Sequence, residues 1–150
     1  MEIWIRPLIE TDRPALRRLY QRVRDVTFHW QPASSHRLSD FDTAHRGETV
    51  LVAVADDQPI GFAAVWPEES FIHSLFVWPE WQGRGLGRDL LRAALRLCDP
   101  ARRPTLKCLV RNARARAFYE AQGWAVLVET HDPDGDYWLM AAPASPAPMT

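Results

Sequence analysis

The sequence predicts an α/β protein built on a mixed, mostly antiparallel sheet of six to seven strands that is flanked by about four helices. Strand-like and helical segments alternate along the chain. Strand candidates that follow one another directly, early and late in the chain, favour antiparallel neighbours, because short turns join such pairs. A passage of strand, helix and strand in the middle of the chain favours one parallel crossover. A mixed sheet accommodates both kinds of connection.

Each element rests on a local pattern. Strands are predicted where branched and aromatic residues gather, at 3–9, 49–55, 60–66, 70–78, 105–110, 124–131 and 137–142. The turns DDQP at 56–59 and DPDG at 132–135 predict hairpins between the strands on either side. Helices are predicted over 11–28, 86–98 and 113–122, with a short helix near 39–46.

Periodicity and end signals support the three longer helices. The first carries an apolar stripe at spacings of three and four, formed by Leu16, Leu19, Tyr20 and Val23. Thr11 or Asp12 is expected to cap this helix. The second carries a similar stripe, formed by Leu86, Leu90, Leu91, Ala94 and Leu95. Asn112 is expected to cap the third helix, and Gly123 is expected to end it.

Composition bounds the class of protein. With 150 residues, of which 47% are apolar, we expect one domain over 1–142 and a disordered Pro- and Ala-rich tail at 143–150. The formal charge of -1 gives no electrostatic reason to expect nucleic acid or an anionic membrane as a partner. No apolar run has the length of a membrane span and no signal-peptide pattern opens the chain, so a cytoplasmic protein is expected. Cys98 and Cys108 fit neither a disulfide framework nor a zinc site; we predict buried thiols and no metal.

The stretch QGRGLGR at 82–88 carries the clearest functional signal. Gly83, Gly85 and Gly87 remove three side chains within five positions, so main-chain N–H groups there are open to a ligand. The positive end of the following helix points the same way, and the two arginines of the stretch add charge. The pattern predicts an anion site. The alternative is a glycine-rich strand-to-helix turn with surface arginines.

Three phosphate-binding loops compete for this pattern. A Walker A loop needs Lys and Ser or Thr after its last glycine, but Arg88 and Asp89 follow Gly87, which excludes it. A dinucleotide-binding fingerprint needs its third glycine at position 88 and an acidic residue about 20 positions further on. The next strand instead ends in Val110–Asn112, so a dinucleotide-dependent oxidoreductase is a weak alternative. The third candidate is the loop that holds the pyrophosphate of coenzyme A.

Two segments resemble the GCN5-related N-acetyltransferase (GNAT) family. Gln82–Gly87 matches its Gln/Arg-x-x-Gly-x-Gly/Ala signature, and Leu75–Glu80 resembles the strand and turn that introduce it. Asn112–Trp124 resembles the family's Asn-to-Gly-Phe/Trp segment. The resemblance implies the acyl-CoA N-acyltransferase fold, acetyl-CoA as donor and direct transfer to an amine. It implies cofactor binding by Leu75, Phe76, Val77, Gln82, Gly83, Arg84, Gly85, Leu86, Gly87, Arg88, Asn112, Ala115, Phe118 and Tyr119.

The resemblance also implies catalytic roles. Tyr119 matches the family's general acid, which faces the departing sulfur. Helical spacing alone favours the alternative, a helix tyrosine that packs by its ring, and the motif reverses this preference. Asn112 is a helix cap by type, and the family adds a hydrogen bond from this residue to the pantetheine arm.

His73 is the candidate general base, because imidazole can take a proton from an ammonium group near neutral pH. Strand alternation predicts that it shares a face with three apolar residues, Phe71, Leu75 and Val77. The alternative for His73 is a satisfied core residue. Glu69 and Glu68 are rival bases, and their alternative is a pair of solvated turn charges. Some family members have no dedicated base.

The acceptor site is expected where the sequence is least regular. In the family, the region after the first helix and the late hairpin border the acceptor, which implies Phe28, His29, Trp30, His36, Tyr137 and Trp138 here. Phe28, Trp30 and His73 are expected to bind it, with Trp66 as a further candidate; core or rim packing is the alternative for the aromatics. The expected acceptor is a primary amine of a small molecule. A protein N-terminus or lysine, and a non-catalytic acyl-CoA-binding module, stay open, and the family allows a homodimer.

Overall fold

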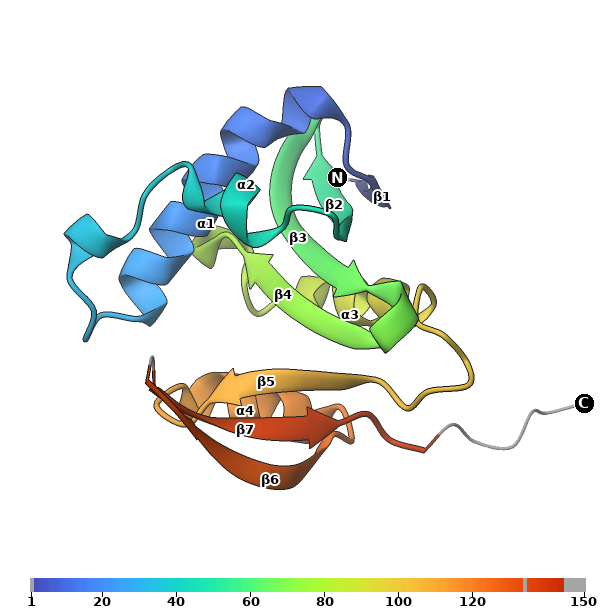
Figure 1. Ribbon diagram of the computed structural model, residues 1–150. Helices are drawn as coiled ribbons and strands as arrows, with labels where there is room; N and C mark the ends of the chain where they lie inside the picture. The colour runs from blue at the N-terminus through green and yellow to red at the C-terminus, as the bar shows by residue number, and fades with distance from the viewer. Residues whose placement is uncertain (1, 134, 145–150) are drawn as a thin grey trace, which may run out of the picture.

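A seven-stranded sheet in the order β1-β2-β3-β4-β5-β7-β6 forms the centre of the computed structural model, which describes residues 2–133 and 135–144 (Figure 1). The strands are β1 (Ile3–Pro7), β2 (Thr49–Ala55), β3 (Gln58–Trp66), β4 (Phe71–Val77), β5 (Thr105–Leu109), β6 (Ala125–Asp132) and β7 (Gly135–Ala141). Neighbours are antiparallel except β4 and β5, which are parallel. The predicted mixed, mostly antiparallel sheet is confirmed.

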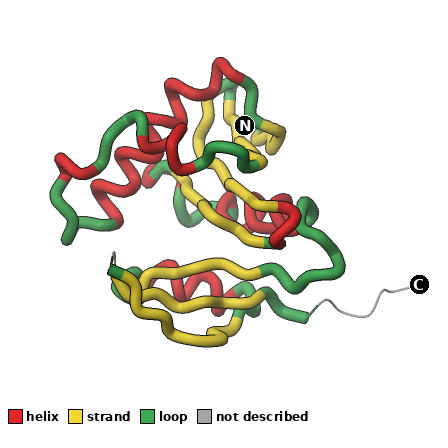
Figure 2. Tube along the Cα trace, viewed as in Figure 1, coloured by secondary structure: helices red, strands yellow, loops and turns green. Residues whose placement is uncertain are grey.

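Helices cover both faces of the sheet (Figure 2). They are α1 (Arg13–Thr27), α2 (Asp40–Ala44), α3 (Leu86–Leu95) and α4 (Ala113–Ala121). On one face, α1 and α2 close an apolar core in which Leu16, Phe41 and Phe62 are fully buried. On the other face, α3 and α4 pack over a second core that contains Leu90 and Leu106. The alternation of β2 divides its residues between these two cores, so both faces of this strand are apolar.

The sheet forks between β4 and β5. Only Phe71 with Thr105 and Ile72 with Leu106 pair across these two strands. Beyond these pairs the strands draw apart toward their C-terminal ends, and the segment that joins α1 to α2 lies on the side where they part (Figure 1). His73 and Lys107 are therefore the first residues of each strand past the last pair. Past the last pair, the facing edges of β4 and β5 have no neighbouring strand among the described residues, so their main-chain N–H and C=O groups are open to a ligand.

A β-bulge in β4 corrects the predicted orientation of His73. Ala64 pairs with Ser74 and Val65 with Ile72, so His73 is the extra residue. The bulge places His73 against His45 on the α2 side, with their ring centres 5.3 Å apart. Leu75 and Val77 instead pack into the core under α3. The predicted shared face of His73 with these two residues is wrong, because one inserted residue interrupts the two-residue alternation. Phe71, before the bulge, does stack on His73, at 6.3 Å.

Smaller differences have local causes. Asp12 is the N-cap residue of α1, one of the two predicted positions, but its carboxylate does not cap the helix. It accepts hydrogen bonds from the Arg6 guanidinium at 2.7 Å and the Ile9 N–H at 2.9 Å instead. The charged partner competes with the helix N–H groups for this carboxylate.

Cys98 and Cys108 are buried free thiols, as predicted. None of the helices within the described ranges has the length and apolar character that a membrane span requires. Of the predicted disordered tail 143–150, residues 145–150 lie outside the described residues.

Candidate active site

A cavity of about 580 Å³ opens in the fork between β4 and β5. One side, called the loop-side wall, is formed by Gln82, Gly83, Gly85, Gly87, Arg88, Asn112, Arg114, Ala115, Phe118, Tyr119 and Gln122. The other side, called the α1-side wall, is formed by Val23, Thr27, Phe28, His73, Ser74, Lys107 and Leu109. The strand edges between the walls contribute Leu75, Phe76, Val77 and Cys108.

The loop-side wall presents bare main chain where α3 begins. Gly83 and Gly85 have φ of 81° and 80°, in the left-handed region that glycine tolerates. Gly85 is the N-cap of α3, and a Cβ at Gly83 would meet no atom within 4 Å. The Gln82 side-chain amide donates a hydrogen bond to the Val77 carbonyl at 3.0 Å, which ties the loop to the end of β4. Free N–H groups at this helix end, beside Arg88, suit an anion.

Two residues of the predicted cofactor set point away from the cavity. Arg84 lies with its guanidinium 4.9 Å from the ring centre of Trp81 and does not line the cavity. Leu86 is 3% exposed, because it begins the apolar stripe of α3 and packs into the core. All other residues of that set line the cavity.

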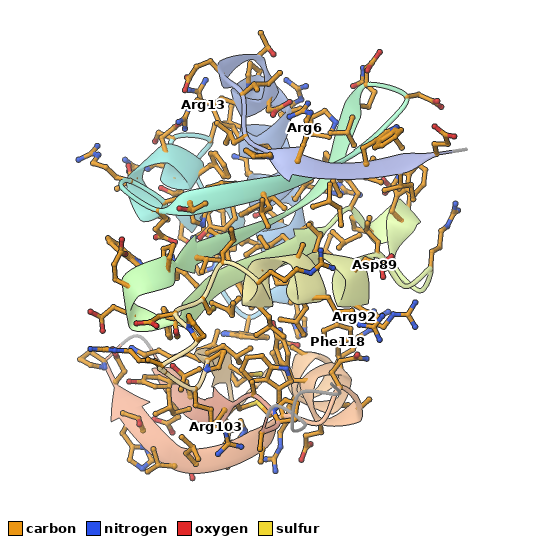
Figure 3. The ribbon with its side chains drawn as sticks, turned by 90° about the vertical axis from the view of Figure 1, so that its right-hand side faces the viewer. Arg6, Arg13, Asp89, Arg92, Arg103 and Phe118 are labelled. Carbon is orange, nitrogen blue, oxygen red and sulfur yellow. The ribbon has the colours of Figure 1, made fainter. Side chains whose placement is uncertain are left out.

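Helix α4 completes the loop-side wall. The Asn112 side chain accepts a hydrogen bond from the Ala115 N–H at 3.1 Å, so the predicted cap is confirmed. Phe118 lies between α3 and α4 (Figure 3), and its ring would be 3.4 Å from a Cβ at Gly87. The missing side chain at Gly87 therefore lets the two helices approach. Burial raises the pKa of Tyr119, which keeps its hydroxyl protonated at neutral pH.

A histidine and a carboxylate meet on the α1-side wall. The His73 Nδ1 atom lies 2.7 Å and 2.9 Å from the two carboxylate oxygens of Glu48. The Glu48 side chain is 1% exposed, whereas that of His73 is 36% exposed. Because Glu48 accepts at Nδ1, the neutral His73 ring carries its proton there and keeps a lone pair on Nε2. Among the described residues, Nε2 has no hydrogen-bond partner.

A second histidine, His45, is hydrogen-bonded to the bulged segment of β4. His45 Nδ1 lies 2.7 Å from the Phe41 carbonyl, and its Nε2 lies 2.7 Å from the Ser74 Oγ. Its ring is surrounded by aromatic rings, and burial lowers the pKa of His45 to about 4. The neutral ring then donates to Phe41 and accepts from the Ser74 hydroxyl. His45 thus fixes the strand residue next to His73.

Several predicted site residues lie elsewhere. Glu69 is 65% exposed and pairs with Arg102 at 3.1 Å, outside the cavity, so the geometry agrees with a solvated turn charge rather than a base. Its rival Glu68, together with His29, Trp30, Trp66, Tyr137 and Trp138, also does not line the cavity. The ring of Trp30 lies 5.1 Å from the Arg111 guanidinium, which links the α1–α2 segment to the end of β5. His36 is buried, and its two ring nitrogens form hydrogen bonds with Asp25 and Gln31.

Other residues at the cavity were not identified from the sequence. Glu48 lies behind His73, and Lys107 and Arg114 line the cavity directly. The only sequence signal for Lys107 is its place in a predicted strand, and Glu48 stands in a polar segment with no motif.

Among the described residues, one group with potential metal ligands, Glu129, His131 and Asp136, brings its atoms within 4.8 Å of one another. These three are exposed on β6 and β7, away from the cavity.

Comparison with known proteins identifies the family. The model of the acetyltransferase (GNAT) family matches residues 13–124, a span that includes the loop-side wall. An uncharacterized N-acetyltransferase of Archaeoglobus fulgidus is 30% identical over 135 residues, covering 81% of this chain and 84% of that protein. A putative ribosomal protein bS18-alanine N-acetyltransferase of Bacillus subtilis is 32% identical over 92 residues, covering 59% of this chain and 58% of that protein.

Solved structures share the fold. Apo YjaB of Escherichia coli has a TM-score of 0.78 at 25% identity, and the match covers 96% of this chain and 100% of that one. The PaiA N-acetyltransferase of Thermoplasma acidophilum, solved with coenzyme A, also has a TM-score of 0.78, at 19% identity over the same shares. The chain belongs to the acetyltransferase (GNAT) family, and the predicted acetyl-CoA-dependent N-acetyltransferase is confirmed at this level.

Proposed function

We propose that this enzyme acetylates a primary amine of a small molecule by direct attack on acetyl-CoA in a ternary complex. The observation that carries the proposal is the cavity in the fork, whose two walls differ in chemistry. The loop-side wall offers main-chain N–H groups and arginines, and the α1-side wall offers a histidine with a free ring nitrogen. Donor and acceptor bound to opposite walls would meet where β4 and β5 part.

The loop-side wall fits acetyl-CoA, which supplies the acetyl thioester. The open space beside Gly83 and the start of α3 would hold the pyrophosphate. Arg88 and Arg114 line the same wall and can donate to phosphate oxygens. No described strand pairs with the β4 edge near Phe76 on the cavity side, which leaves main-chain groups for the pantetheine arm.

The reaction needs one proton removed and one delivered. His73 takes a proton from the acceptor ammonium at Nε2, and the free amine attacks the thioester carbonyl. Tyr119 gives its hydroxyl proton to the departing sulfur. Burial raises the pKa of the Cys108 thiol to about 11, so this cavity residue is protonated at neutral pH and a poor nucleophile. That property supports direct attack rather than transfer through an acetyl-cysteine.

Lys107 restricts the acceptor. Its ammonium lies 4.6 Å from the ring centre of Tyr137, and no carboxylate among the described residues pairs with it. None of the described residues that line the cavity is Asp or Glu. A polyamine would bring a second cation toward Lys107, so a monoamine with a neutral or anionic neighbouring group fits better.

A peptide N-terminus is the second candidate acceptor. The Bacillus subtilis relative is described as an alanine N-acetyltransferase of a ribosomal protein, and an N-terminal alanine has one amine and no second cation. Such an acceptor agrees with Lys107 as well as a small monoamine does.

A screen for acetylated products tests the proposal. The protein is mixed with acetyl-CoA and monoamines, amino acids, polyamines, or peptides that begin with alanine, and thiol release and product mass are recorded. We expect acetylation of a small monoamine, with polyamines poor. Acetylation of the peptides alone would favour the second candidate, and tight acetyl-CoA binding without any product would indicate a non-catalytic module. The cytoplasmic location, the absence of a metal and the homodimer stay predictions from the sequence.

A further inference from the structure

The carboxylate of Glu48 is buried beside His73, the candidate general base of the α1-side wall. It lies in the segment between α2 and β2, and its side chain is 1% exposed. Both of its oxygens are within 2.9 Å of His73 Nδ1. The His73 ring spans the distance from this carboxylate to the cavity, which it lines.

A buried carboxylate is unfavourable unless a partner compensates its charge. Among the described residues, Glu48 forms its ion pair with His73 and with no arginine or lysine. The charge of this carboxylate is therefore balanced best when His73 is protonated. That state is the one a general base reaches during the reaction.

We propose that Glu48 is a positioning residue for acetyl transfer, holding His73 with its proton on Nδ1 and stabilising the imidazolium that forms when Nε2 takes the acceptor's proton. The inference rests on the proposed function. In this step an ammonium N–H bond breaks and the Nε2–H bond forms, while the amine keeps the electron pair that attacks the thioester carbonyl. The Nδ1 proton stays in its hydrogen bond to Glu48, and water in the cavity later removes the proton from Nε2.

The other groups around His73 do not take over this role. His45, at 5.3 Å between ring centres, has both nitrogens engaged by Phe41 and Ser74 and stays neutral. Lys107, on the neighbouring strand, is a cation and cannot stabilise an imidazolium. On α1, Arg24 is engaged by Asp40. Glu48 is thus the anion in contact with His73.

The kinetic test uses Glu48→Gln, which removes the charge and keeps an oxygen that can accept from Nδ1. Loss of the carboxylate charge should lower kcat/KM about 10-fold near neutral pH, since the imidazolium that forms in the reaction is less stabilised. The Kd for acetyl-CoA should not change. The matched control is Glu10→Gln, at a carboxylate that is 81% exposed and distant from the cavity.

A second measurement does not depend on turnover. Nitrogen-15 NMR of histidine-labelled wild-type protein reports which ring nitrogen of His73 carries the proton, and Nδ1 is expected. Protonation on Nε2 in the neutral ring, or a kcat/KM of Glu48→Gln equal to that of wild type, overturns the inference. Failure of the proposed function looks different: wild-type protein would bind acetyl-CoA and acetylate none of the amines.

Discussion

The two walls of the cavity differ in how the chain assembles them. The loop-side wall comes from two contiguous segments, 82–88 and 112–122, each of which begins or forms a helix. The α1-side wall draws on α1, β4 and β5, and its support comes from further away. Glu48 is 25 residues from His73, and His45 is 29 residues from Ser74. One wall is encoded locally, and the other depends on tertiary contacts.

This difference separates two functions. Main-chain groups and helix ends form the loop-side wall, so its chemistry needs glycines more than particular side chains. The α1-side wall acts through the protonation of one ring, which depends on each neighbouring charge. Substitutions in the glycine loop of the first wall should change donor binding, and those on the second wall should change acceptor deprotonation and acceptor choice. Tyr119 is the residue of the first wall that should affect proton transfer instead.

The largest expected effect comes from His73→Ala on the α1-side wall. Loss of the general base should lower kcat/KM about 1000-fold near neutral pH. The Kd for acetyl-CoA, measured by calorimetry, should stay unchanged because the donor contacts the other wall. His131→Ala, at a histidine that is 74% exposed on β6, is the matched control. A large loss of acetyl-CoA affinity in His73→Ala would show that the walls are not separable.

The second effect concerns stability rather than turnover. The ordinary pKa of 6.5 applies to His45 in the unfolded chain, whereas burial lowers it to about 4 in the fold. The unfolded chain therefore binds a proton that the folded chain excludes, so stability is full above pH 6.5 and falls as the pH drops toward 4. The free energy of unfolding should decrease by about 3 kcal/mol over this window. Urea unfolding at several pH values measures it, and His45→Gln should remove most of this part of the slope.

The loop-side wall could be predicted because its signals are local. The glycine pattern at 82–88 and the cap at Asn112 act within one helical turn of their own positions. Element types and most bounds were predicted for the same reason. Arg84 and Leu86 are the two predicted cofactor residues whose side chains do not line the cavity. Along the turn, the Arg84 side chain lies against Trp81 and the Leu86 side chain packs into the core.

The α1-side wall could only be predicted in part. His73 was identified by type, but its orientation depends on a bulge set by pairing with β3, and no local signal marks that extra residue. Glu48 lies in a polar segment, and no residue spacing in that segment predicts that its side chain is buried against His73 of β4. The separate roles of His45 and His73 also arise from tertiary contacts, because both have the same intrinsic chemistry.

The third effect tests catalysis from the loop-side wall. Tyr119→Phe removes the hydroxyl that would protonate the departing sulfur, and should lower kcat about 100-fold. The ring should keep its packing beside Phe118 and Trp124, so folding and the Kd for acetyl-CoA should change little. Stopped-flow thiol release measures the rate. Turnover equal to wild type across the pH range would exclude the acid role.

The smallest effect tests the glycine loop itself. At Gly85, φ is 80° and an added Cβ would lie 3.0 Å from Arg88 Nη2, so Gly85→Ala strains the N-cap of α3 and moves Arg88. The Kd for acetyl-CoA should rise about 10-fold as the N–H groups of the loop lose alignment. The KM for the acceptor at saturating acetyl-CoA should stay constant, because the α1-side wall is untouched. Gly123→Ala, at φ 89° outside the cavity, imposes a similar strain and should reduce stability without changing this Kd. Equal losses of affinity in both variants would mean that backbone strain, rather than the loop's contact with the donor, sets the affinity.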